Sequence, residues 1–144
     1  MTFKEAVEIT PEIVNGFQTG LTALGKHKEK IAVSNTRLLE GSVDIDLTTK
    51  PLYPHENRWD YALAYDKKVY FVEVHPANTS EVDVVLKKLQ WLKDWLKNKA
   101  PHISSLKADA PYYWIQSSNF AIKTSPQYRR ISQAKLIPIK RLSL

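Results

Sequence analysis

Two acidic residues lie inside otherwise apolar stretches that follow one another closely in the chain. Asp60 belongs to Arg58–Tyr65 and Glu73 to Val69–His75, and the charged residues Asp66-Lys67-Lys68 join the two stretches. A carboxylate is costly to bury in an apolar strand, so each acid calls for a partner. Two carboxylates on one face can bind a divalent ion such as Mg²⁺, and a nearby histidine adds a general base or a ligand for a softer ion such as Mn²⁺. These residue types suggest a site for a divalent ion.

The two stretches predict a β-hairpin that would bring the acids together. If the turn is a two-residue loop at Asp66-Lys67, or a four-residue loop in the same register, Asp60 falls directly opposite Glu73. Side chains alternate along a strand, so Asp60, Glu73 and His75 would share one face. Directly opposed residues lie roughly 5 Å apart at Cβ. We therefore expect Asp60 and Glu73 to be close enough to hold one divalent ion between them, with His75 on the same face.

Each of these residues also has a purely structural interpretation. Asp60 could pair with Arg58, with Lys68 or with a backbone amide at the start of its strand. Glu73 could form a salt bridge with a lysine across the hairpin. His75 could be an ordinary histidine at a strand end. A shared face is what favours the catalytic interpretation of the three together.

Around the hairpin, the apolar pattern predicts one α/β (α+β) domain over residues 1–144, a mixed β-sheet flanked by helices. The expected elements are a helix from Thr10 to Leu24 ended by Gly25, a strand over Ser42–Thr48, a long helix from Asn78–Ser80 to about Lys99, a central strand over Ala110–Ser117, a short helix over Ser125–Ala134 and an edge strand over Leu136–Ile139.

Five further polar residues are candidates for completing a site. Asp44 or Asp46 on the neighbouring strand, or Glu12 on the first helix, would add a third carboxylate. Lys87 and Lys88 on the long helix are candidates for contacts to nucleic-acid phosphate, or for supplying a cation to the acids. The alternative for both lysines is a solvated helix face.

This order of elements, with an acid on the second strand and Glu-X-basic on the third, resembles the PD-(D/E)XK nuclease-like superfamily, the restriction-endonuclease-like fold. The resemblance covers roughly residues 10–117 and rests on Trp59-Asp60 and Glu73-Val74-His75. It implies phosphodiester cleavage, with Asp60, Glu73 and His75 as the catalytic residues and the two acids holding Mg²⁺ or Mn²⁺. His75 stands where the family has lysine, and its ordinary pKa near 6.5 leaves it mostly neutral at pH 7.

Composition narrows the possible partners and location. The chain has a net charge of +6 and contains no cysteine. The charge is compatible with DNA or RNA as partner, and the lack of cysteine excludes disulfides and zinc–thiolate sites. The motifs of P-loop, HExxH and Gly-X-Ser-X-Gly enzymes are missing from the sequence. No signal peptide or membrane-spanning stretch is visible, so we expect a cytoplasmic protein without a membrane partner.

Three hypotheses follow from the sequence. The first is a metal-dependent nuclease that acts through Asp60, Glu73 and His75. The second is a nuclease-like protein that has lost cleavage and binds nucleic acid or regulates another process. The third is a protein-interaction domain, a homodimer formed through the helix that carries Trp91 and Trp95.

Overall fold

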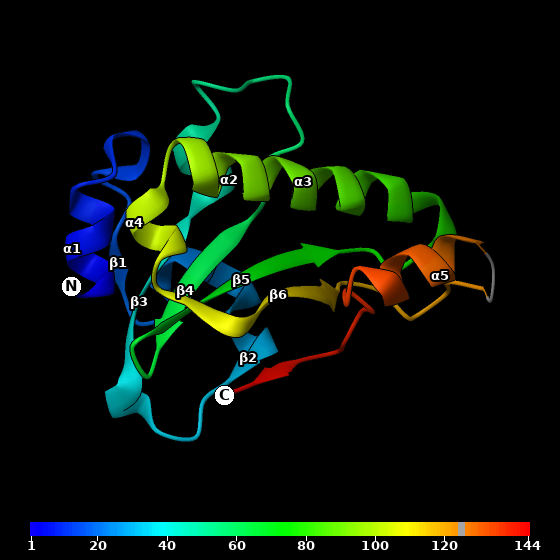
Figure 1. The fold of residues 1–144 in the computed structure, drawn as a ribbon. Helices are drawn as coiled ribbons and strands as arrows, with labels where there is room; N and C mark the ends of the chain where they lie inside the picture. Colours follow the sequence, from blue (N-terminus) through cyan, green and yellow to red (C-terminus); the bar gives the residue numbers. More distant parts are fainter. Residues whose placement is uncertain (124–125) are drawn as a thin grey trace.

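A five-stranded mixed sheet forms the centre of the computed structural model, which describes residues 1–123 and 126–144 (Figure 1). The strand order is β1-β3-β4-β5-β6, and only the β5–β6 pair is parallel. The strands of this sheet are β1 (Gln18–Thr19), β3 (Leu39–Asp44), β4 (Tyr61–Tyr65), β5 (Lys68–His75) and β6 (Lys107–Gln116). The expected mixed sheet flanked by helices is confirmed.

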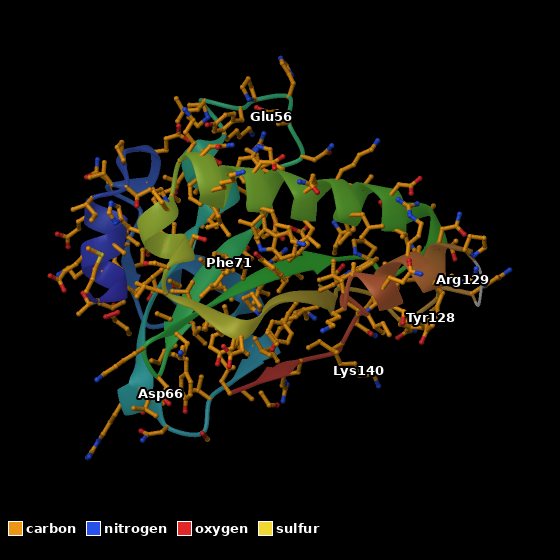
Figure 2. The ribbon with its side chains drawn as sticks, in the orientation of Figure 1. Glu56, Asp66, Phe71, Tyr128, Arg129 and Lys140 are labelled. Carbon is orange, nitrogen blue, oxygen red and sulfur yellow. The ribbon has the colours of Figure 1, made fainter. Side chains whose placement is uncertain are left out.

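The β4–β5 hairpin has the predicted register. Tyr65 pairs with Lys68 and Tyr61 with Val72, which leaves Asp66 and Lys67 as a two-residue loop. Both loop residues have positive φ, 49° and 63°, as a type I′ turn requires. Figure 2 shows Asp66 at the far tip of this hairpin. The next pair beyond Tyr61 and Val72 brings Asp60 opposite Glu73.

The long helix α3 (Val82–Asn98) crosses one face of the sheet and connects the parallel strands β5 and β6 (Figure 1). A 3₁₀ turn, η4 (Thr79–Glu81), leads into it. The residues of α3 that pack into the core repeat at helical spacing: Val82, Val85, Leu89, Leu92, Trp95 and Leu96. Phe71 of β5 is fully buried under this helix, as Figure 2 shows. The predicted long helix is therefore confirmed.

The opposite face of the sheet has its own, smaller core. It is covered by a parallel pair of short strands, β2 (Ile31–Ala32) and β7 (Leu142–Ser143), which lie beneath the sheet in Figure 1. The strand order of the five-stranded sheet puts β6 at an edge, so the predicted central position was wrong. The predicted edge strand is reduced to one parallel bridge between Ile139 and Ile115.

The helix predicted from Thr10 to Leu24 does not form. The segment contains a 3₁₀ turn, η1 (Pro11–Ile13), then β1, and then the irregular 3₁₀ stretch η2 (Thr22–Lys30). Gly20, inside the predicted helix, takes a left-handed conformation with φ of 57° that an α-helix cannot contain. The N-terminal helix lies earlier instead, as α1 (Phe3–Glu8), where Thr2 and Glu5 form a capping box.

The strand predicted over Ser42–Thr48 ends early. β3, preceded by η3 (Thr36–Leu38), stops at Asp44, whose carboxylate accepts the Leu47 N–H at 2.8 Å and caps the short helix α2 (Ile45–Thr49). The alternating pattern predicted a longer strand, but a helix begins after Asp44 because aspartate is a favoured N-cap residue.

Two further short helices complete the described chain: α4 (Pro101–Ser104) and α5 (Pro126–Gln133). The predicted short helix matches α5, although Ser125 lies outside the described residues. Among the helices in the described ranges, none combines the length and apolar character needed to cross a membrane.

Candidate active site

Asp60 and Glu73 hold one another in place through the backbone of the hairpin. The Asp60 N–H donates to Glu73 Oε1 at 3.1 Å, and the Val74 N–H donates to Asp60 Oδ2 at 3.0 Å. The Glu73 side chain is fully buried and that of Asp60 is 18% exposed. Each carboxylate is therefore fixed by the strand that carries the other, with one oxygen left for a second partner.

That second partner is Lys88, which reaches down from α3. Its Nζ lies 2.5 Å from Glu73 Oε2 and 3.7 Å from Asp60 Oδ1, with the lysine side chain 16% exposed. Lys88 immediately precedes the buried Leu89 and lies at the border of the apolar face of α3 that packs on the sheet. Lys87 is exposed and has no part in the cluster, so the solvated interpretation fits Lys87 but not Lys88.

His75 lies at the end of β5 and contacts two carboxylates. Its Nδ1 is 3.3 Å from Glu73 Oε2 and its Nε2 is 3.2 Å from Glu81 Oε2. The ring packs edge-on against Trp114, at 6.4 Å between centroids. Glu81 is a residue of the cluster that the sequence did not single out. The sequence signal for it was its position shortly after the end of β5 and at the start of α3.

Burial and charge together shift the pKa values of the cluster. Burial, followed by the charge of Glu73, raises the pKa of Asp60 from 3.8 to about 7. Burial alone would lower the pKa of Lys88, but the neighbouring Glu73 and Asp60 carboxylates outweigh it and raise that pKa. The hydrogen bond to Glu73 raises the pKa of His75. The raised pKa values of Lys88 and His75 therefore favour the protonated, positively charged forms of both side chains.

The other acids suggested by the sequence are engaged elsewhere. Asp46 forms an ion pair with Arg58 at 2.9 Å, and Asp44 caps α2. Glu12 accepts a hydrogen bond from Trp95 Nε1 at 3.0 Å, near the other end of α3. The predicted third carboxylate is therefore not supplied by any of the three.

Asp60 and Glu73 are the residues of the cluster whose carboxylates could hold a divalent ion. Within residues 1–123 and 126–144, no three or more His, Cys, Asp or Glu side chains are arranged to hold a metal ion together. Proteins bind Mg²⁺ with one or two carboxylates, while water and phosphate oxygens complete its shell. Asp60 and Glu73 already converge on one cationic group, the Lys88 ammonium. These two residues could therefore hold Mg²⁺ or Mn²⁺.

Comparison of the chain with protein-family models, with curated proteins and with solved structures gives no match. The interpretation of the cluster therefore rests on its own side chains and on the order of the elements that carry them.

Proposed function

We propose that this protein is a divalent-metal-dependent, nuclease-like protein with a restriction-endonuclease-like fold that acts on phosphodiester bonds of DNA or RNA. The observation that supports it is the meeting of Asp60, Glu73 and Lys88 on one face of the sheet. Two acids and one lysine are the residue types of the PD-(D/E)XK motif. Here the lysine comes from the helix after the motif, while His75 occupies its usual place. The cytoplasmic location expected from the sequence belongs to the same proposal.

Each residue of the cluster has a role in this proposal. Asp60 and Glu73 would hold the metal ion, which when bound activates water and offsets charge on the scissile phosphate. Lys88 keeps a positive charge beside the same carboxylates and would stabilise the negative charge that develops on phosphate. His75 is a positioning residue, since it is hydrogen-bonded to both Glu73 and Glu81 and so fixes the Glu73 carboxylate.

A second candidate is a nucleic-acid-binding or regulatory protein on the same fold without cleavage. One observation favours it: the Lys88 ammonium already partners both carboxylates without any metal ion. The homodimer hypothesis gains no comparable support. Trp91 stacks on Trp95 at 5.8 Å and packs edge-on against Tyr53 at 5.6 Å, so these rings contact one another within the chain.

The experiment is cleavage of labelled DNA and RNA with Mg²⁺, with Mn²⁺ and with a chelator. The wild type should cleave only with a metal ion, and Glu73→Gln should lose about 100-fold or more of the rate, as expected for a removed metal ligand. Glu8→Gln, at an exposed acid near the N-terminus and far from Glu73 in the sequence, is the matched control and should keep full activity. If neither ion supports cleavage above the Glu73→Gln level, the enzyme proposal is rejected; retained nucleic-acid binding would then favour the second candidate.

A further inference from the structure

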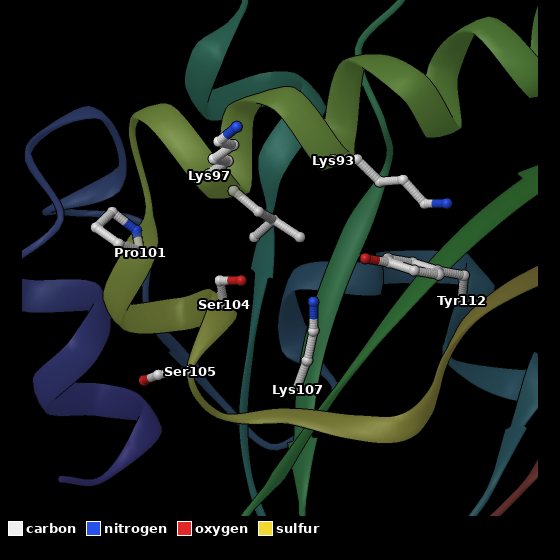
Figure 3. Close-up of a pocket in the computed structure, with 8 residues that line it drawn as sticks. Lys93, Lys97, Pro101, Ser104, Ser105, Lys107 and Tyr112 are labelled. Atoms are coloured by element: carbon white, nitrogen blue, oxygen red, sulfur yellow. The ribbon is translucent and has the colours of Figure 1, made fainter.

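A hollow lies beside α3, away from the acid cluster, and three lysines line it. It lies between the C-terminal half of α3, the short helix α4 and β6, and has a volume of about 680 Å³ (Figure 3). The residues that line it are Lys93, Leu96, Lys97, Pro101, Ser104, Ser105, Lys107 and Tyr112.

The three lysines of this hollow have no compensating acid. The hollow contains no carboxylate in its lining, and in the described part of the chain none of the three amines forms an ion pair. Lys93 and Lys97 are four residues apart on α3, a spacing at which like charges repel. Lys107 extends from β6 toward the helix above it in Figure 3. A concentration of charge of one sign without a counter-charge favours binding of an anion.

The remaining polar groups suit an oxyanion. The Lys93 amine lies over the Tyr112 ring, 5.4 Å from its centroid, which fixes the amine at one edge of the hollow. Ser104 places its hydroxyl in the lining, while the Ser105 hydroxyl donates to the His102 carbonyl at 2.7 Å. Ammonium and hydroxyl donors without competing carboxylates are the groups that bind phosphate oxygens.

The hollow is separate from the acid cluster. Lys88 reaches toward Asp60, directly before β4, and Glu73 on β5, whereas Lys93 contacts Tyr112 on β6. Because β5 lies between β4 and β6, the two groups of residues lie toward different edges of the sheet. Evidence for one of these sites is therefore independent of evidence for the other.

We infer that this hollow is a phosphate-binding site for a ligand that carries several phosphate groups. Its volume falls within the range of roughly 300–1,000 Å³ that is common for ligand sites and exceeds the needs of a single phosphate. The phosphates could belong to a free polyphosphate compound or to the backbone of a nucleic acid. The chemistry that recognises them is the same, so the binding experiment has one arm for each source. The inference does not depend on cleavage at Asp60 and Glu73.

The test measures binding of sodium tripolyphosphate and of a single-stranded 20-nucleotide DNA by calorimetry. The variant Lys93→Gln/Lys97→Gln/Lys107→Gln should weaken binding of at least one probe by tenfold or more. The matched control is Lys26→Gln/Lys28→Gln/Lys50→Gln, which removes the same charge from exposed lysines elsewhere and should change binding less than twofold. A loss limited to tripolyphosphate identifies a free ligand, and a loss that includes DNA identifies the backbone.

The inference is overturned if the two triple variants lose affinity equally, or if the wild type binds neither probe. Amide chemical shifts of the wild type give a reading that does not depend on the folding of any variant. On addition of tripolyphosphate, the amides of Ser104, Ser105 and Lys107 should move most. Shifts spread evenly over all exposed lysines would contradict a built site.

Discussion

The pair formed by Glu73 and Lys88 is the feature on which the site depends at the scale of single residues. The Glu73 side chain is fully buried, that of Lys88 is 16% exposed, and the two charged groups are 2.5 Å apart. A buried ion pair adds little net stability compared with apolar residues, but removal of one partner leaves the other charge uncompensated.

Glu73→Gln should therefore destabilise the fold by about 3 kcal/mol, because Lys88 then keeps a largely buried charge beside only Asp60. Glu73→Gln/Lys88→Met should recover most of that loss. The free energy of unfolding in urea measures both changes. Lys87→Met, at the exposed neighbour, is the control and should stay within about 0.5 kcal/mol of the wild type. A double variant as unstable as the single one would show that the ion pair is not the cause.

The stability of the fold should fall with rising pH through the titration of Asp60. Its pKa is raised from 3.8 to about 7, first by burial and next by Glu73, so the fold favours the protonated form. This stabilisation is complete below about pH 4 and is lost as pH rises through 7, and the raised pKa of His75 acts in the same direction. Between pH 5 and 7.5, we expect the wild type to lose about 2 kcal/mol more than Asp60→Asn.

Urea unfolding at the two pH values, in the presence of a chelator, gives this difference directly. Parallel losses in the wild type and in Asp60→Asn would mean that the aspartate titrates near its ordinary value in the folded protein.

Three residues of the cluster could be predicted from the sequence for a clear reason. Alternation along two strands joined by a two-residue loop fixes which residues share a face, so Asp60, Glu73 and His75 followed from spacing alone. Lys87 and Lys88 could not be separated in this way. Which shoulder residue of a helix reaches the sheet depends on how the helix crosses it, and that depends on the packing of the whole domain.

At the scale of elements, the hairpin turn determines the register of the site. Asp66 and Lys67 both occupy the left-handed region, which glycine adopts without strain and lysine does not. Lys67→Gly should therefore stabilise the protein by about 0.5–1 kcal/mol, measured by thermal unfolding. Lys68→Gly, one residue later in the extended strand, is the control and should destabilise it. Destabilisation by Lys67→Gly would contradict a type I′ turn at this position.

The helix predicted from Thr10 to Leu24 does not form. Its apolar residues have helical spacing, but the glycines in the segment disfavour a helix. Ile13 and Leu24 are buried as expected, but a 3₁₀ turn and an irregular stretch bury them equally well. Gly20, with φ of 57°, takes a left-handed conformation between them. The capping box of Thr2 and Glu5 was a sequence signal for α1 that outweighs such spacing.

At the scale of the whole molecule, two candidate sites of opposite character lie toward different edges of the sheet. The acid cluster lies toward β4, and the lysine hollow lies toward β6. The expectation of a central β6 failed because the sequence pattern of an aromatic strand does not reveal its neighbours. In the structure, burial of the second face comes from the short β2–β7 pair, which no pattern predicted.

The net charge of +6 leads to a prediction about association with nucleic acid. Lysine contacts to phosphate release counterions, so binding should weaken by about tenfold or more between 50 and 200 mM salt. Fluorescence anisotropy of a labelled oligonucleotide, in a chelator that prevents cleavage, measures this dependence. Binding that does not change with salt would argue against a phosphate contact surface on this protein.

The most direct test of the central claim compares two adjacent lysines in the metal-dependent cleavage assay. Lys88 contacts both acids, and Lys87 is exposed on the same helix, so Lys88→Met and Lys87→Met change composition identically. If Asp60, Glu73 and Lys88 form the active site, Lys88→Met should lose about 100-fold or more of the cleavage rate while remaining folded, and Lys87→Met should keep the wild-type rate. Full activity in Lys88→Met, or an equal loss in both variants, would contradict the claim.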